Sequence, residues 1–137
     1  MITLLVLLVL AILVVYKTQE DPRMTALKRR YYMFLNTLPE SYKKLKTPSI
    51  LTGTYIKNDI GSNVNKGGEI FMCLDGSTND QFHILLHELS HSLVTEYDHT
   101  DNFWAQYKGM KNFAIQQGYY EPIKTKKYCG NVISDSS

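Results

Sequence analysis

The sequence predicts an α+β fold, in which a small, mainly antiparallel sheet packs with two helices, and a separate apolar helix lies at the N-terminus. Residues 49–74 are rich in β-branched, aromatic and apolar side chains punctuated by Gly and Asn, which is typical of short strands. From Thr78 onward, apolar residues recur at spacings of three and four, which predicts amphipathic helices. The first 16 residues are almost entirely apolar.

The composition is that of a folded protein with one domain. The chain has 137 residues, of which 44% are hydrophobic and 20% are charged, and this balance excludes a disordered chain. The net charge of +2 is too small to predict nucleic acid as a partner. Cys73 and Cys129 are too few for a zinc site made of thiolates alone. One disulfide remains open, but two free thiols are the plainer interpretation.

Residues 1–17 predict a single-pass membrane anchor that binds the lipid bilayer. As a helix, Ile2–Tyr16 spans about 22 Å, short of a hydrocarbon core of about 30 Å, and Lys17 lengthens the span by reaching the interface. No basic residue precedes the run and no small-residue cleavage site follows it, which favours an anchor over a cleaved secretory signal or a buried helix.

Basic residues follow the apolar run, at Lys17, Arg23, Lys28, Arg29 and Arg30. This bias predicts that the rest of the chain faces the cytosol. Both cysteines would then lie in a reducing environment.

Residues 18–48 predict a juxtamembrane helix and a connection that pack on the domain. Asp21 caps this helix, Pro22 suits its first turn, and Pro39 ends it. Its apolar face consists of Met24, Leu27, Tyr31, Phe34 and Leu38.

Residues 49–130 predict the core of the domain. The strands are "ILTGTYIKN" and "EIFMCL", and a tight turn at "NKGGE" leads into the second. Thr78 and Gln81 then fit a capping box at the start of a helix. Its apolar stripe consists of Phe82, Leu85, Leu86, Leu89 and Leu93.

A further helix is predicted to begin near Thr100 or Asp101 and to stop at Gly118. Phe103 and Trp104 are expected in the core rather than against a substrate. The tail, residues 131–137, is expected to fray. The apolar side of the helix consists of Phe103, Tyr107, Met110 and Ala114.

The segment "HELSH" matches H-E-x-x-H and predicts a metal site. On a helix, His87 and His91 lie one turn apart on the same face, so both imidazoles can bind one ion. Glu88 is offset by one residue and points beside the metal, which suits a base that acts on metal-bound water. The alternative is an amphipathic helix whose polar face happens to contain histidines.

A catalytic zinc requires a third protein ligand, and His99 is the main candidate. It lies eight residues after His91, at the start of the next helix, so the chain must turn between them. Oxygen ligands that compete with it are Glu96, Asp98 and Asp101. His83 is about 12 Å of helix rise from His91, so these two cannot share one ion, and His83 is expected to support the site or the edge of the core.

Four segments of the chain resemble WLM-like and SprT-like zincin metallopeptidases, which are small H-E-x-x-H proteins common in large DNA viruses. These segments are "NKGGEIFMCLDG", "LLHELSHSL", "HTDNFW" and "YYEPIKTKKYCG". The resemblance implies a minimal zincin-like fold, one Zn²⁺ per chain held by His87, His91 and His99, and Glu88 as catalytic acid and base. It also implies that the strand 69–74 is a sheet edge along which a peptide substrate binds. Relatives usually carry Gly where this chain has Asp98.

The function expected from these features is a membrane-anchored zinc metalloprotease that cleaves proteins or peptides with a Glu-activated, zinc-bound water. Its domain would face the cytosol or the virion interior. Tyr97, Tyr119 and Tyr120 are candidates for stabilising the oxyanion. The alternative is a catalytically silent, zinc-stabilised zincin fold that serves as a binding module or virion membrane component. Cleavage of proteins crosslinked to DNA, known among such relatives, is disfavoured by the low net charge and the anchor.

Overall fold

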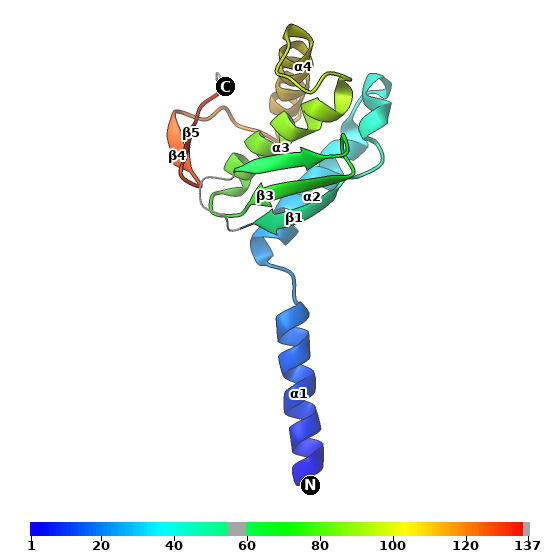
Figure 1. Cartoon of the computed structure of the whole chain (residues 1–137), viewed down its shortest axis with the longest axis vertical. Helices are drawn as coiled ribbons and strands as arrows, with labels where there is room; N and C mark the ends of the chain where they lie inside the picture. Colours follow the sequence, from blue (N-terminus) through cyan, green and yellow to red (C-terminus); the bar gives the residue numbers. More distant parts are fainter. Residues whose placement is uncertain (55–59, 136–137) are drawn as a thin grey trace.

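The structure, a computed structural model, describes residues 1–54 and 60–135. It is a mixed α+β fold with a small sheet and several helices, which confirms this part of the predicted fold class (Figure 1). In chain order the elements are α1 (Ile2–Thr18), α2 (Pro22–Thr37), the 3-10 helix η1 (Glu40–Leu45), β1 (Ile50–Thr54), β2 (Gly61–Val64), β3 (Glu69–Cys73), α3 (Thr78–Leu93), α4 (Asp101–Gln116), β4 (Lys126–Tyr128) and β5 (Asn131–Ile133).

The main sheet has the strand order β1-β3-β2. The central strand β3 is parallel to β1 and antiparallel to β2, so the prediction of a mainly antiparallel sheet is wrong for the β1 pairing. The prediction that residues 69–74 form an edge is also wrong, because β2 covers that side of β3. The sequence did not predict β2, whose "GSNV" offers one large apolar residue and no alternating pattern. The predicted strand over 50–58 is present at Ile50–Thr54, and residues 55–58 lie outside the described residues.

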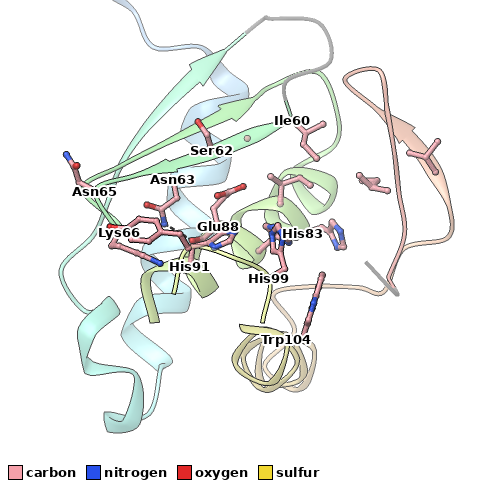
Figure 2. Close-up of a pocket in the computed structure, with 16 residues that line it drawn as sticks. Ile60, Ser62, Asn63, Asn65, Lys66, His83, Glu88, His91, His99 and Trp104 are labelled. Carbon is pink, nitrogen blue, oxygen red and sulfur yellow. Dashed lines mark hydrogen bonds between the residues drawn. The ribbon is translucent and has the colours of Figure 1, made fainter. Parts of the chain in front are cut away.

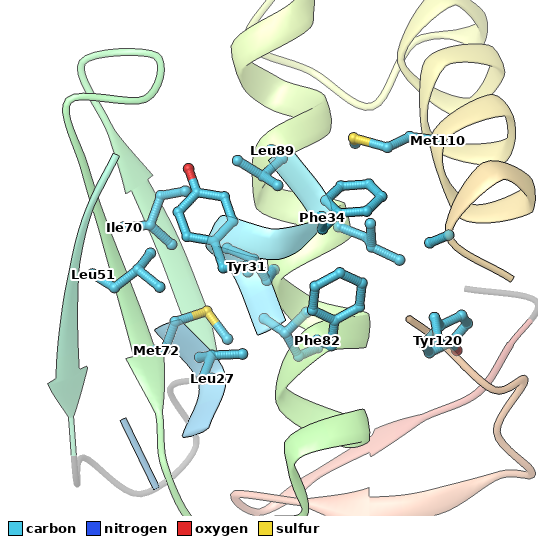
Figure 3. Packing of buried hydrophobic residues seen from close by; sticks show 14 of the residues in the cluster. Leu27, Tyr31, Phe34, Leu51, Ile70, Met72, Phe82, Leu89, Met110 and Tyr120 are labelled. Carbon is cyan, nitrogen blue, oxygen red and sulfur yellow. The ribbon is translucent and has the colours of Figure 1, made fainter. Parts of the chain in front are cut away.

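Helix α2 forms as the sequence predicts. The carboxylate of Asp21 accepts a hydrogen bond from the Arg23 backbone N–H at 2.9 Å, and Pro22 occupies the first turn. Figure 3 shows Tyr31 of this helix next to the sheet, on the side of Leu51, Ile70 and Met72. Phe34 lies toward α3 and α4, with its ring centroid 5.3 Å from that of Phe82 and 6.2 Å from that of Phe113. The predicted apolar face of α2 is buried in full: Met24, Leu27, Tyr31, Phe34 and Leu38.

Helix α3 begins with a capping box that differs by one residue from the predicted one. The Ser77 hydroxyl accepts from the Asp80 N–H at 3.1 Å, and the Asp80 carboxylate accepts from the Ser77 N–H at 3.3 Å. Gln81 instead donates its side-chain amide to the Leu74 carbonyl at 3.0 Å. The start of α3 is therefore tied to the end of the central strand, which fixes the helix on the sheet.

The C-terminal segment does not fray as expected. Strands β4 and β5 pair as an antiparallel hairpin, and Ile133 is only 3% exposed. A disulfide joins Cys73 of β3 to Cys129 of the hairpin turn, so the interpretation as two free thiols is wrong. This bond closes a loop of 56 residues, for which a stabilisation of about 2–4 kcal/mol is typical. Residues 136 and 137 of the predicted frayed tail lie outside the described residues.

Helix α1 extends away from the rest of the chain, and none of its residues is buried (Figure 1). No single helix within residues 1–54 and 60–135 is both long enough and apolar enough to cross a membrane. Helices α1 and α2 together meet both requirements, with a bend of 50° between them.

Candidate metal centre

Three histidines from two segments converge beside α3. His87 and His91 lie one turn apart on this helix, with ring centroids 5.2 Å apart. His99 immediately precedes Thr100, whose hydroxyl caps α4 by accepting from the Phe103 N–H at 3.2 Å. The chain turns back between the helices, so that His99 Nε2 lies 3.0 Å from His87 Nε2. One nitrogen from each of the three imidazoles lies within 4.8 Å of the others.

The three acidic residues that compete with His99 do not join this cluster. Among the described residues, the group able to hold one ion consists of the three histidines, without Glu96, Asp98 or Asp101. The Glu96 carboxylate accepts instead from the Asn102 amide at 3.5 Å. The geometry therefore favours His99 as the third donor.

Aromatic rings of α4 pack against the imidazoles. The Phe103 ring lies 4.4 Å from the His91 ring and 4.8 Å from the His99 ring, centroid to centroid, and Phe103 is fully buried as predicted. Trp104 stacks on His99 at 5.7 Å. Trp104 was expected in the core, but it is only half-buried and lines the cavity beside the histidines. The first turn of α4 thus fixes the orientation of His99.

Burial lowers the pKa values of His87 and His91 and so favours their neutral form. The pKa of His87 is lowered to about 3, chiefly by burial and further by His91 and His99. Burial is also the largest cause of the lowered pKa of His91, followed by the charges of His99 and Lys66. Because a metal binds neutral imidazole, protons compete little for these two donors at neutral pH.

Glu88 lies in the same cavity as the histidines and is only 7% exposed. The edge strand β2 approaches it closely. A Cβ added at Gly61 would lie 2.8 Å from Ile84 Cγ2, so glycine leaves room for Ile84, and it would lie at an ordinary contact distance of 3.6 Å from Glu88 Oε1. The Asn63 amide donates to the Glu88 carbonyl at 2.7 Å and joins β2 to α3. Sequence reasoning missed Gly61 and Asn63, because β2 itself carried no strand signal.

His83 takes no part in the cluster, as the helix rise predicts. It is 2% exposed, and its Nδ1 lies 2.9 Å from the Tyr120 hydroxyl, which itself donates to Asp135 at 2.8 Å. Burial is the main cause of the lowered pKa of His83, and Lys111 adds to it against the opposing charges of Asp135 and Asp80. The site therefore has a buried polar chain behind it that reaches the end of the described chain.

The cavity that contains these groups has a volume of about 560 Å³. In the view of Figure 2, Lys66 and Asn65 lie on one side of it, Ile60 and Trp104 lie on the other, and Glu88 lies between them. Its walls come from β2, α3, the turn before α4, the first turn of α4, and β5.

The chain has limited similarity to known proteins. No protein-family profile matches the chain. Uncharacterized protein 042R of Invertebrate iridescent virus 3 is 42% identical over 53 residues, which cover 37% of this chain and 33% of that protein. The chain thus matches about a third of the length of this curated relative.

Parts of the chain are similar to two solved structures. Wss1 from Saccharomyces cerevisiae has a TM-score of 0.38 and 24% identity, covering 50% of this chain and 62% of that one. A mutant of the same protein has a TM-score of 0.42 and 20% identity, covering 75% of this chain and 90% of that one.

Replacing His99 with alanine is expected to abolish or greatly weaken zinc binding, because two imidazoles of one helix would remain as donors. Metal analysis of the purified full chain after dialysis should give about one zinc per wild-type chain and little in His99→Ala. Asp98→Ala is the matched control and should keep its zinc. Unchanged metal in His99→Ala would assign the third position to Asp98, Glu96 or Asp101.

His83 is expected to make stability fall in acid. In the unfolded chain its pKa is about 6.5, and burial lowers it in the fold, so below about pH 6.5 the unfolded state binds a proton that the folded state does not. Unfolding midpoints in urea should therefore decrease as the pH falls from 7.5 to 5. The midpoint should depend less steeply on pH in His83→Gln than in wild type. An equally steep dependence in both proteins would contradict the contribution of His83.

Proposed function

We propose that this chain is a zinc-dependent metallopeptidase of the zincin type. One observation carries the proposal: three imidazole nitrogens lie within 4.8 Å of one another in the cavity that also contains the buried Glu88. The resemblance of "LLHELSHSL" and "HTDNFW" to WLM-like and SprT-like zincins supports the same assignment.

The donor set fits zinc. Zinc bonds to histidine measure about 2.0–2.1 Å, so two nitrogens on one ion lie up to about 4.2 Å apart. The nitrogens of His87 and His99 already lie within that limit at 3.0 Å, and a spread of 4.8 Å across the three needs only small ring rotations. Three protein ligands would leave one position for water or substrate, as in catalytic rather than structural zinc sites.

A zinc ion held by these ligands would supply Lewis acidity, which lowers the pKa of water and polarises the peptide carbonyl. Glu88 is the proton carrier: its carboxylate takes the proton of the attacking water and passes it to the leaving amine. Glu88 is only 7% exposed and lines the cavity. Glu88 thereby stays within reach of a bound peptide.

Of the three tyrosines considered for the oxyanion, Tyr97 fits best. It is 84% exposed and lines the cavity. The Tyr120 hydroxyl is bound to Asp135, and the Tyr119 hydroxyl donates to the Met33 carbonyl at 3.4 Å. Tyr97 is therefore the donor that we propose for the developing negative charge.

A peptide substrate would bind along β2. This strand is an edge of the sheet, and Gly61, Ser62 and Asn63 line the cavity. An extended peptide gains main-chain hydrogen bonds when it adds to such an edge. The substrate edge expected from the resemblance is thus moved from residues 69–74 to β2.

The same histidines also support a second function, a catalytically silent module in which zinc ties α3 to the segment before α4. His99 is exposed and comes from a turn, so an ion shared with His87 would restrain that turn. This function needs the three imidazoles but not Glu88.

Replacing Glu88 with glutamine separates the two functions. We expect peptide hydrolysis to fall by about 10²–10⁴-fold, because glutamine cannot accept the proton, while zinc content and thermal stability stay near wild type. Hydrolysis of a broad peptide library, followed by mass spectrometry, measures the loss. Undiminished hydrolysis in Glu88→Gln would reject Glu88 as the base, and an inactive wild type with bound zinc would favour the silent module.

We also propose that α1 anchors the chain in a membrane. Helix α1 alone does not meet the length required of a single span, so the proposal rests on its composition and exposure. Its large apolar side chains are exposed, and none of its residues is buried. The basic flank favours the cytosol or the virion interior for the domain, whereas the disulfide is more typical of an oxidising compartment.

The paired substitution Leu8→Arg and Val9→Arg is expected to release the chain from membranes, because a central Arg costs about 2.5–3.5 kcal/mol on insertion. Carbonate extraction of membranes should leave wild type in the pellet and the variant in the supernatant, with Ile50→Arg on the sheet as the control. Protease added to sealed microsomes should digest the domain if it faces the cytosol. A protected domain would contradict that orientation.

A further inference from the structure

The hairpin β4–β5 forms a wall of the cavity that contains the candidate metal centre. Val132 and Ile133 of β5 line this cavity together with the three histidines. Ile133 is 3% exposed, whereas the neighbouring Val132 is 67% exposed. The chain therefore holds an uncovered apolar side chain at the cavity, on a strand whose next residue is buried.

The first strand of this hairpin is attached to β3 and α3. Cys129 is joined to Cys73 by the disulfide, and the Tyr128 hydroxyl donates to the Cys73 carbonyl. Lys126 Nζ lies 2.8 Å from the Asp80 carboxylate in the first turn of α3. The position of β4 is therefore fixed relative to the helix that carries His87 and His91.

The segment after β5 is attached as well. Asp135 accepts a hydrogen bond from Tyr120 at 2.8 Å, and Lys111 of α4 donates to the Asp135 backbone carbonyl at 2.7 Å. Contacts on both sides of Val132 thus hold β5 in place without covering that side chain. A wall of this kind presents a defined surface to whatever enters the cavity.

Several apolar side chains line the cavity, among them Ile60, Ile84, Val132 and Ile133. Apart from the histidines, Lys66 and Glu88 are the only described residues lining the cavity that carry a formal charge. Figure 2 shows Lys66 on the side opposite to Ile60 and Trp104. A charged group that entered at Ile60 and Trp104 would lose water without gaining a counter-charge, whereas an apolar group would gain from burial.

We propose that β5 determines substrate specificity: Val132, with Ile60 and Trp104, binds an apolar side chain of a peptide that lies along β2. This inference rests on the proposed peptidase function and names its substrate class. The occupant follows from continuity, because β2, the histidines and β5 line one cavity. A peptide paired with β2 directs alternate side chains to the same side, so one of them can reach the wall while its backbone passes the histidines.

The test measures peptide binding and cleavage separately. The full chain with Glu88→Gln, in nanodiscs and with zinc, is titrated with short blocked polyalanine peptides that carry leucine or glutamate at one scanned position. Trp104 is the only tryptophan of the chain and lines the cavity, so its fluorescence reports occupancy. At one position we expect leucine to bind about tenfold more tightly than glutamate.

Substitutions at Val132 decide whether β5 causes this preference. Val132→Asp should remove it, and the conservative Val132→Leu should keep it. Ile50→Asp is the matched control, because Ile50 is equally exposed at 66% but lies on β1, outside the residues that line the cavity. A leucine preference that persists in Val132→Asp, or that is absent without any substitution, would overturn the proposal.

Cleavage by the chain with Glu88 intact distinguishes this inference from the proposed function. Selective binding without cleavage of any peptide would overturn the peptidase function and still support β5 as the binding wall. Cleavage that shows the same residue preference in wild type and Val132→Asp would support the peptidase function and overturn the role of β5.

Discussion

The period of one helix determines the architecture around the candidate site. Four residues separate His87 from His91, so both imidazoles project from the same face of α3, and the intervening Glu88 projects beside them. A third nitrogen must then come from elsewhere in the chain, and His99 supplies it from the position just before Thr100, the cap of α4. The pairing of α3 with α4 and the contact of Phe103 with the imidazoles both serve this convergence.

The sheet contributes through its least regular strand. β2 has no alternating apolar pattern, yet its glycine leaves room for Ile84, and its Asn63 is hydrogen-bonded to both α3 and the following turn. In that turn Asn65, Lys66 and Gly67 all have positive φ, a conformation that costs free energy for Asn and Lys. The Lys66 ammonium reaches across to the Glu96 carbonyl and rests over the Tyr97 ring at 4.4 Å. These contacts hold one side of the cavity.

Local signals in the sequence were sufficient where one helix face or one cap decides the structure. The apolar spacing of α2 and α4, the Asp21 cap and the four-residue histidine spacing depend on neighbouring residues and were predicted. Pairing between distant segments was not: the parallel partner of β3, the strand β2 and the bond from Cys73 to Cys129 depend on which segments meet in space. His99 was predicted as a donor but with acidic competitors, since the course of its turn is a tertiary property.

The polar chain behind α3 has a consequence for the end of the polypeptide. His83 of α3 is linked to Asp135 through Tyr120, and Lys111 of α4 forms an ion pair with the same aspartate. The last described residue is therefore connected to both helices. Removing Asp135 would take away the acceptor of the buried Tyr120 hydroxyl. Asp135 therefore belongs to the folded unit, and an affinity tag is better fused at the opposite terminus.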